Sequence, residues 1–214
     1  MRGETLVIVP MKDPARAKTR LAGALDPFER ARFAITLFKR TLHLLLSMQR
    51  EDLAFDLAVV SGNEEIKTLA AQIGIRTIDE NPALSLSDAL DQAASLASVE
   101  GYDRLCVIPA DLAAPDPIDL EKFLFTRFGT DGIALSPSRD FGTNALLASP
   151  PNAIPFAYGP GSFHHHLAVA EARGLTPIIL PLESLKWDID TTDDLAEFAA
   201  KHPGVWDGAA HRNP

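Results

Sequence analysis

Short apolar runs alternate with segments of helical periodicity from residue 6 to residue 128. The runs consist mainly of valine, leucine and isoleucine, which is typical of buried strands, and they cover residues 6–10, 57–61, 75–78 and 104–108. Helices are expected where apolar residues recur every three or four positions, at residues 27–49, 63–74, 87–98 and 116–128. Alternation of this kind predicts a mostly parallel sheet with helices on both faces.

The pattern changes in the last third of the chain, where strands become shorter and turns richer in proline and glycine. Strands are expected at residues 132–136, 144–148 and 176–180, and helices at residues 162–173 and after Thr191. Thr191 can cap the last helix, because Asp194 follows three residues later. We predict one α/β domain over residues 1–200, a three-layer α/β/α fold with a mostly parallel mixed sheet, and a loosely ordered tail over residues 201–214.

The composition narrows the classes of protein to consider. Hydrophobic residues make up 46% of the 214 residues, enough for one packed core, but no apolar run is long enough to span a membrane. The net charge of −9 argues against nucleic acid as a partner, and without a signal peptide a cytoplasmic location is expected. The single cysteine, Cys106, excludes an intramolecular disulfide and is expected to be buried in its strand.

A basic loop follows the first strand. Residues 12–20 carry four cations and one acid, Asp13, for a net charge of +3; the cations are Lys12, Arg16, Lys18 and Arg20. Neither the dinucleotide-binding G-x-G-x-x-G motif nor a Walker-type phosphate loop is present. The loop is either an ordinary solvated segment or a cradle for a small polyanion. Its position at the carboxyl end of a strand, where open α/β sheets bind ligands, favours a cradle for a triphosphate.

Three aspartates stand where a parallel sheet would present ligands. Asp111 directly follows the strand at residues 104–108, and Asp116 is the better cap for the next helix, which leaves Asp111 free. Asp188 and Asp190 flank Ile189, and at strand spacing both carboxylates face the same side. Adjacent carboxylates repel one another unless a cation lies between them, so this pattern predicts a Mg²⁺ or Mn²⁺ site. The alternative for the pair is a solvated turn before a helix.

Two polar turns are candidates for a second anion site. Residues 158–163 combine two glycines with Ser162 at the start of a helix, where free N–H groups bind anions, although Ser162 can equally be a simple N-cap. Residues 142–144 form a second turn of this kind. The run of three histidines at residues 164–166 cannot hold one metal ion, because consecutive helical residues point about 100° apart. One of them is expected to face the interior.

Taken together, these segments resemble the 2-phospho-L-lactate guanylyltransferase family (CofC type) of deazaflavin coenzyme F-420 biosynthesis. The resemblance extends over residues 5–200 and rests on five motifs in order: Val9-Pro10-Met11-Lys12 with Ala17-Lys18-Thr19-Arg20-Leu21, Pro109-Ala110-Asp111-Leu112, Gly142-Thr143-Asn144-Ala145-Leu146-Leu147, Gly159-Pro160-Gly161-Ser162-Phe163 and Asp188-Ile189-Asp190-Thr191. It implies a nucleotide-diphospho-sugar-transferase-like (Rossmann-like) fold and transfer of GMP from GTP to a small phospho-carboxylic acid.

The resemblance also assigns roles to individual residues. It implies that Asp111, Asp188 and Asp190 bind the metal and, with Lys18, form the catalytic centre. Contacts to GTP are expected from Lys12, Lys18, Arg20 and Ser87. The phosphate of the acceptor acid is expected to contact Thr143, Gly159 and Ser162.

One departure from the family pattern concerns the base of the nucleotide. The family usually has Gly-Leu-Asn before the helix near residue 87, whereas this chain has Ser85-Leu86-Ser87, so the preference for GTP over ATP is left open. The acceptor is 2-phospho-L-lactate, phosphoenolpyruvate or 3-phospho-D-glycerate, and the sequence does not choose among them. It also leaves open a homodimer, the number of metal ions, and two other functions: a D-x-D glycosyltransferase of the same fold and a non-catalytic nucleotide-binding regulator.

Overall fold

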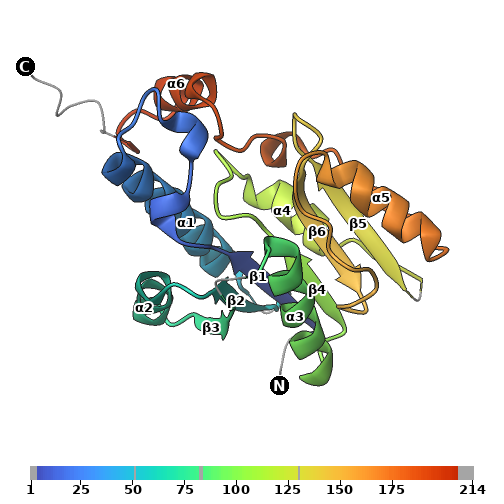
Figure 1. Ribbon diagram of the computed structural model, residues 1–214. Coiled ribbons are helices and arrows are strands. Elements are labelled where there is room, and N and C mark those ends of the chain that lie inside the picture. Colours follow the sequence, from blue (N-terminus) through green and yellow to red (C-terminus); the bar gives the residue numbers. More distant parts are fainter. Residues whose placement is uncertain (1–3, 51, 82–83, 130, 207–214) are drawn as a thin grey trace, which may run out of the picture.

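A mixed sheet of seven strands forms the core of the computed structural model, which describes residues 4–50, 52–81, 84–129 and 131–206 (Figure 1). The strand order is β3-β2-β1-β4-β6-β5-β7. Strands β1 to β4 run parallel, and β6 is antiparallel to both of its neighbours, β4 and β5. The strands are β1 (Thr5–Pro10), β2 (Asp56–Ser61), β3 (Arg76–Asp79), β4 (Arg104–Val107), β5 (Gly132–Pro137), β6 (Thr143–Ser149) and β7 (Ile178–Ile179). The predicted mostly parallel mixed sheet is confirmed.

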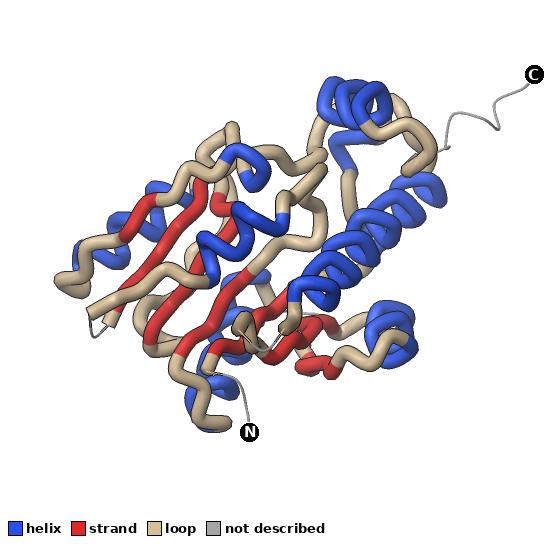
Figure 2. Tube along the Cα trace, turned by 180° about the vertical axis from the view of Figure 1, so that it is seen from behind, coloured by secondary structure: helices blue, strands red, loops and turns tan. Residues whose placement is uncertain are grey.

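Helices cover both faces of the sheet, which gives the three predicted layers (Figure 2). One face packs against α1 (Pro27–Met48), α2 (Glu64–Gln72) and α4 (Pro117–Leu124), and the other against α3 (Leu86–Val99) and α5 (Ser162–Ala172). Alternate residues of β1 supply the two cores: Val7 and Val9 face the first, whereas Leu6 and Ile8 face the second.

A third core lies beside the sheet, where α6 (Thr192–Lys201) packs against α1. Its fully buried members include Phe33 of α1, Phe198 of α6 and Ile189 of the segment that precedes α6. Short 3-10 helices complete the described elements: η1 (Pro14–Arg16), η2 (Thr19–Leu21) and η3 (Glu183–Leu185). This third core fixes the segment that carries two of the candidate metal ligands.

The predicted helix starts are confirmed by their caps. Asp26 forms a reciprocal capping box with Glu29, in which each side chain accepts the other's backbone N–H at 2.8 Å. Thr191 forms the same arrangement with Asp194 at the start of α6. Asn63 and Asp116 cap α2 and α4, so Asp111 is not used as a cap.

Two elements are shorter than predicted. Helix α4 ends at Leu124, not near residue 128, because Arg104 of β4 donates hydrogen bonds to the carbonyl oxygens of Leu124 and Thr126, at 2.6 and 3.0 Å. Strand β7 is reduced to Ile178–Ile179. Pro177 directly precedes it and Pro181 follows two residues after it, and neither proline has a backbone N–H to donate to a neighbouring strand. The start of α5 also differs in detail, since its N-cap is Gly161 and Ser162 is already helical.

The start of the predicted loose tail is more ordered than expected. Lys201 is the last residue of α6, and the ring of Trp206 packs at 4.9 Å between centroids against Phe33. The rest of the predicted tail, residues 207–214, lies outside the described residues. Cys106 is buried as predicted. Within the described part of the chain, no helix combines the length and apolarity needed to cross a bilayer.

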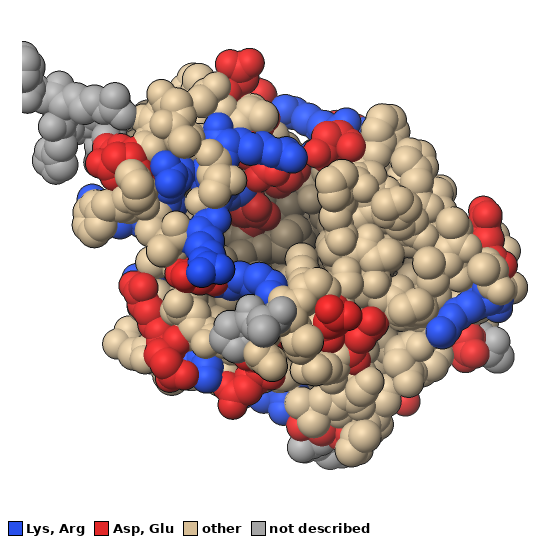
Figure 3. Space-filling model, in the orientation of Figure 1, with Lys and Arg blue, Asp and Glu red and all other residues tan. Residues whose placement is uncertain are grey.

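The topology brings several polar loops to one edge of the sheet. The parallel strands β1 to β4 end at this edge, and because β6 runs in the opposite direction, its first residue, Thr143, lies there too. The loops after β1 and β4 and the β5–β6 turn therefore meet. On this face of the molecule Lys and Arg side chains line one rim of a hollow, and carboxylates lie within it (Figure 3).

Candidate active site

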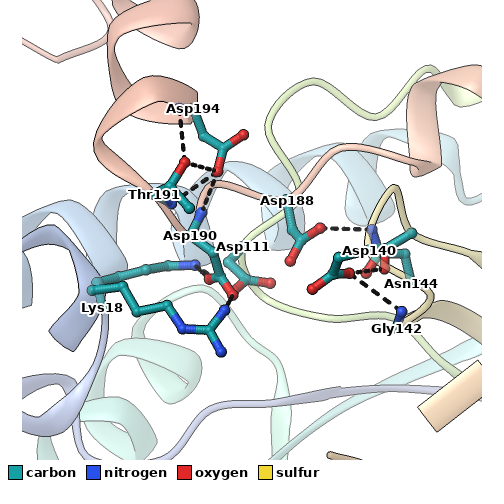
Figure 4. Close-up of polar contacts among 11 residues, drawn as sticks. Lys18, Asp111, Asp140, Gly142, Asn144, Asp188, Asp190, Thr191 and Asp194 are labelled. Atoms are coloured by element: carbon teal, nitrogen blue, oxygen red, sulfur yellow. Dashed lines mark hydrogen bonds and ion pairs between the residues drawn. The ribbon is translucent and has the colours of Figure 1, made fainter. Parts of the chain in front are cut away.

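The three predicted aspartates converge at this edge. Carboxylate oxygens of Asp111, Asp188 and Asp190 all lie within 4.8 Å of one another (Figure 4). Asp111 follows β4, and an antiparallel bridge between Leu112 and Asp188 brings the distant segment beside it. Ile189, fully buried in the third core, anchors that segment, so its two neighbours face the site as the alternation predicted.

Lys18 joins two of these carboxylates. Its Nζ atom lies 2.5 Å from Oδ2 of Asp111 and 2.9 Å from Oδ1 of Asp190, and its side chain is only 5% exposed. Burial opposes the charge of Lys18, but the two carboxylates outweigh it, so the pKa of Lys18 is raised. Its backbone adopts the left-handed conformation, with φ of 53°, which is uncommon outside glycine and concentrates at functional sites.

Asp188 is left without such a cation. Burial, and after it the charge of Asp111, raises the pKa of Asp188 to about 6, although Asn144 donates a hydrogen bond to its Oδ1 atom at 3.2 Å. A second bond from Asn144 to the carbonyl of Leu185, at 2.8 Å, fixes the amide. Three carboxylates beside the ammonium of Lys18 keep a net negative charge, and oxygen donors of this kind suit a hard divalent cation, so the residues present fit a metal ion of the Mg²⁺ or Mn²⁺ type.

The other three cations of the basic loop have different partners and different degrees of exposure. The guanidinium of Arg20 is largely exposed and lies 3.6 Å from Oδ2 of Asp190, at the rim of the cluster. Arg16 points into solvent beside Asp13. Lys12 lies apart from the aspartates, because its Nζ atom donates to the carbonyl of Leu84 at 2.6 Å and pairs with Glu80 at 3.2 Å. Of the predicted basic residues, the structure thus brings Lys18 and Arg20 to the carboxylates.

The two polar turns, predicted as candidates for a second anion site, lie in contact with each other. The hydroxyl of Ser162 donates to that of Thr143 at 3.1 Å, and both side chains are buried. Gly159 and Gly161 have φ values of 146° and 66°, conformations that favour glycine, and they turn the chain so that α5 begins here. Free N–H groups at a helix start attract anions.

His166 is the interior member of the histidine run. It is fully buried, whereas His164 and His165 are exposed, as predicted. Its Nδ1 atom lies 3.0 Å from the hydroxyl of Thr143, and its Nε2 atom accepts the N–H of Ala157 at 2.9 Å. Burial lowers the pKa of His166 to about 4, so the ring is neutral at physiological pH.

Ser87 links α3 to the turn that precedes α5. Its hydroxyl oxygen accepts the backbone N–H of Tyr158 at 2.9 Å, in the turn that precedes α5. The contact with nucleotide expected for Ser87 stays a prediction, but the side chain also has this structural partner.

Three side chains that lie at the site were given no role there by the sequence analysis. Asn144 orients Asp188, and Asp194 accepts the backbone N–H of Asp190 at 3.3 Å. Asp140, in the β5–β6 turn, accepts hydrogen bonds from the hydroxyl of Ser138 and the N–H of Gly142, and the bond from Ser138 is the main reason why its pKa is lowered (Figure 4). The capping box at Thr191 was the available signal for Asp194. Nothing local marked Asp140.

Comparison with known proteins identifies the family. The model of the "Guanylyl transferase CofC like" family matches residues 5–204. The chain belongs to this family. The 3-phospho-D-glycerate guanylyltransferase of Colwellia psychrerythraea is 37% identical over 195 residues, which cover 91% of each chain. The phosphoenolpyruvate guanylyltransferase of Sphaerobacter thermophilus is 36% identical over 202 residues, covering 93% of this chain and 94% of that one.

A solved structure supports the fold of this CofC-like chain independently. A protein from Desulfovibrio desulfuricans described as a nucleotide-diphospho-sugar transferase superposes with a TM-score of 0.72 at 19% identity, over 95% of this chain and 89% of that one. At this identity the likeness concerns the fold alone. The fold is the one that the resemblance implied.

Proposed function

We propose that this protein transfers GMP from GTP to the phosphate of a small phospho-carboxylic acid and releases pyrophosphate, a step of deazaflavin coenzyme F-420 biosynthesis in its family. The observation that carries the proposal is the convergence of Lys18 and three aspartates, beside the buried hydroxyls of Thr143 and Ser162, at one edge of the sheet. In this proposal the triphosphate binds at the aspartates and Lys18, and the second anion binds beside it at the two hydroxyls.

The reaction makes one bond and breaks one. An oxygen of the acceptor's phosphate attacks the α-phosphorus of GTP, and the bond from that phosphorus to the β-phosphate oxygen breaks. Pyrophosphate leaves with the electron pair of the broken bond. No side chain has to remove a proton, because the second pKa of a phosphate monoester is about 6 and the nucleophile is already ionised at neutral pH.

The protein's task is electrostatic, since two anions must approach each other. We assign Asp111, Asp188 and Asp190 to hold Mg²⁺ or Mn²⁺, which supplies neutralising charge and orients phosphate oxygens when bound. Lys18 adds a fixed ammonium between Asp111 and Asp190, and Arg20 at the rim offers a planar fork to the leaving phosphates.

The second anion belongs to the acceptor. Thr143 and Ser162 supply hydroxyls, and the glycine turn at Gly159 supplies backbone N–H groups close to the helix start. The relatives' names give 3-phospho-D-glycerate in one case and phosphoenolpyruvate in another, so the acceptor is a small acid that carries one phosphate and one carboxylate.

The test is pyrophosphate release with GTP, Mg²⁺ and, separately, 2-phospho-L-lactate, phosphoenolpyruvate and 3-phospho-D-glycerate. We expect release with one of these acids and a product whose mass equals that of GMP joined to the acid. ATP and a nucleotide sugar serve as controls and are expected to give little turnover. GTP binding without pyrophosphate release with any acid would identify a regulator instead, and turnover of the nucleotide sugar a glycosyltransferase.

A further inference from the structure

Glu80 is a buried carboxylate that the reaction described above does not use. It follows β3, and its side chain is 3% exposed. Its Oε1 atom pairs with Nζ of Lys12 at 3.2 Å, whereas its Oε2 atom is fully buried and has no hydrogen-bond partner among the described residues. A buried carboxylate oxygen without a donor is costly, so a partner from outside the chain is expected at this atom.

Glu80 lies at the same edge of the sheet as the catalytic cluster. Its backbone N–H donates to the carbonyl of Ser61 at 3.4 Å, and the hydroxyl of Ser61 donates to the carbonyl of Met11 at 2.7 Å. The carboxylate therefore sits among the ends of β1, β2 and β3, next to the start of α3. Lys12 ties it to the loop before α3 through its bond to Leu84.

The strand order places this carboxylate on the nucleoside side of the site. Along this edge, in the order of the strands, Glu80 lies at the ends of β3 and β2, and the basic loop follows β1. Asp111 then follows β4, and Thr143 begins β6. In the proposed function the triphosphate binds at Lys18 and Asp111, and the acceptor occupies the part of the edge next to β6, at Thr143. The base of the nucleotide then extends toward β2 and β3, where Glu80 lies.

The chemistry of the free oxygen matches guanine. The Watson–Crick edge of guanine presents two adjacent donors, N1–H and the 2-amino group, and an ionised carboxylate accepts two such bonds, one at each oxygen. Oε2 of Glu80 has no partner among the described residues, and Oε1 keeps a lone pair beyond the one that Lys12 uses. Adenine presents an unprotonated N1 there, which repels a carboxylate. We propose that Glu80 recognises the N1–H and 2-amino groups of guanine, with Lys12 holding the carboxylate in place through Oε1. The proposal rests on the proposed function, because it takes GTP as the nucleotide.

The proposed role of Glu80 gives a basis for the preference for GTP over ATP, which the segment Ser85-Leu86-Ser87 leaves open. The chain lacks the family's usual Gly-Leu-Asn segment, and under this proposal the carboxylate of Glu80 provides the selection for guanine in its place. A site built to hydrogen-bond a particular group rejects a ligand that lacks it, because its own polar atoms are then left unpaired.

The test exchanges one donor–acceptor pattern for another. In Glu80→Gln the side chain keeps its size but offers one acceptor and one donor, which suits xanthine, whose N1–H adjoins a 2-carbonyl oxygen. We expect kcat/KM for GTP to fall by about 100-fold and that for XTP to rise by about tenfold or more. Glu65→Gln, at an exposed position of the neighbouring α2, is the matched control and should change neither value. A gain with XTP cannot arise from a damaged fold; unchanged selectivity, or equal loss with both nucleotides, would overturn the proposal.

Binding measured by titration calorimetry separates this proposal from the proposed function. Wild-type protein is titrated with GTP, ITP and XTP in the presence of Mg²⁺ and without acceptor. ITP lacks the 2-amino group, and we expect it to bind about tenfold more weakly than GTP. Equal affinity for ITP and GTP would overturn the role of Glu80 even if the variant fails to fold. Tight, selective GTP binding without pyrophosphate release would instead refute the proposed function alone.

Discussion

The Nδ1 atom of His166 lies 3.0 Å from the hydroxyl oxygen of Thr143, the residue that we propose binds the phosphate of the acceptor. Because Nε2 of His166 accepts the N–H of Ala157, the ring proton must be on Nδ1, and His166 donates to Thr143. Ser162 donates to the same oxygen. Thr143 therefore accepts two hydrogen bonds and keeps its own proton for an incoming phosphate.

Burial of the neutral ring makes stability depend on pH. The pKa of His166 is lowered to about 4 by burial, whereas an unfolded histidine titrates near about 6.5. Between these values the unfolded chain binds a proton that the native protein does not, so stability falls as pH drops from 6.5 to 4, by about 3 kcal/mol. In urea unfolding at a series of pH values, His166→Gln should lose this part of the slope. His164→Gln, at an exposed position, should keep it, and equal slopes in all three proteins would refute the assignment.

The hydroxyl of Thr143 should matter for the acceptor and not for GTP. Thr143→Val keeps the shape of the side chain and removes the donor, so KM for the phospho-acid is expected to rise by about tenfold or more, while KM for GTP stays within twofold, a change of about 0.4 kcal/mol. Thr68→Val, on the exposed surface of α2, is the control. An equal rise in both KM values would mean that Thr143 supports the fold of the whole site instead.

Lys18 should stabilise the cluster whenever metal is absent. Lys18→Met removes the ammonium between Asp111 and Asp190, which leaves three neighbouring carboxylates to repel one another. In EDTA the midpoint of thermal unfolding of this variant is expected to lie about 5 °C or more below that of the wild type. Millimolar Mg²⁺ should then raise the midpoint of the variant by more than it raises that of the wild type. Arg16→Met, at an exposed position of the same loop, is the control. A Mg²⁺ effect of the same size in all three proteins would contradict this prediction.

The parts of the site that could be predicted from the sequence are those that follow from strand pattern and strand order. Apolar runs identified the strands, and the rule that ligands bind at the carboxyl ends of parallel strands predicted that Asp111 and Lys18 lie at the same edge of the sheet. The spacing of Asp188 and Asp190 around a buried Ile189 gave their common direction. These inferences depend on periodicity and chain order, both of which are present in a single sequence.

Contacts between side chains far apart in the chain could not be predicted from the sequence. The contact of Lys12 with GTP stays a prediction, and in the structure Lys12 pairs with Glu80, 68 residues further along, a contact that no periodicity marks. The early end of α4 has the same origin, since Arg104 reaches it from another strand. Both depend on side-chain reach across the fold, which hydrophobic patterning does not encode.

The role of the three aspartates is tested most directly by the rate of pyrophosphate release from GTP, with Mg²⁺ and the active phospho-acid, in Asp111→Asn. The substitution preserves shape and removes one negative charge from the cluster, and Asp103→Asn, an exposed position before β4, is the control. We expect the control to match the wild type and Asp111→Asn to remain folded with its rate lowered by at least about 100-fold. A folded Asp111→Asn protein that releases pyrophosphate at a near-normal rate would contradict the account.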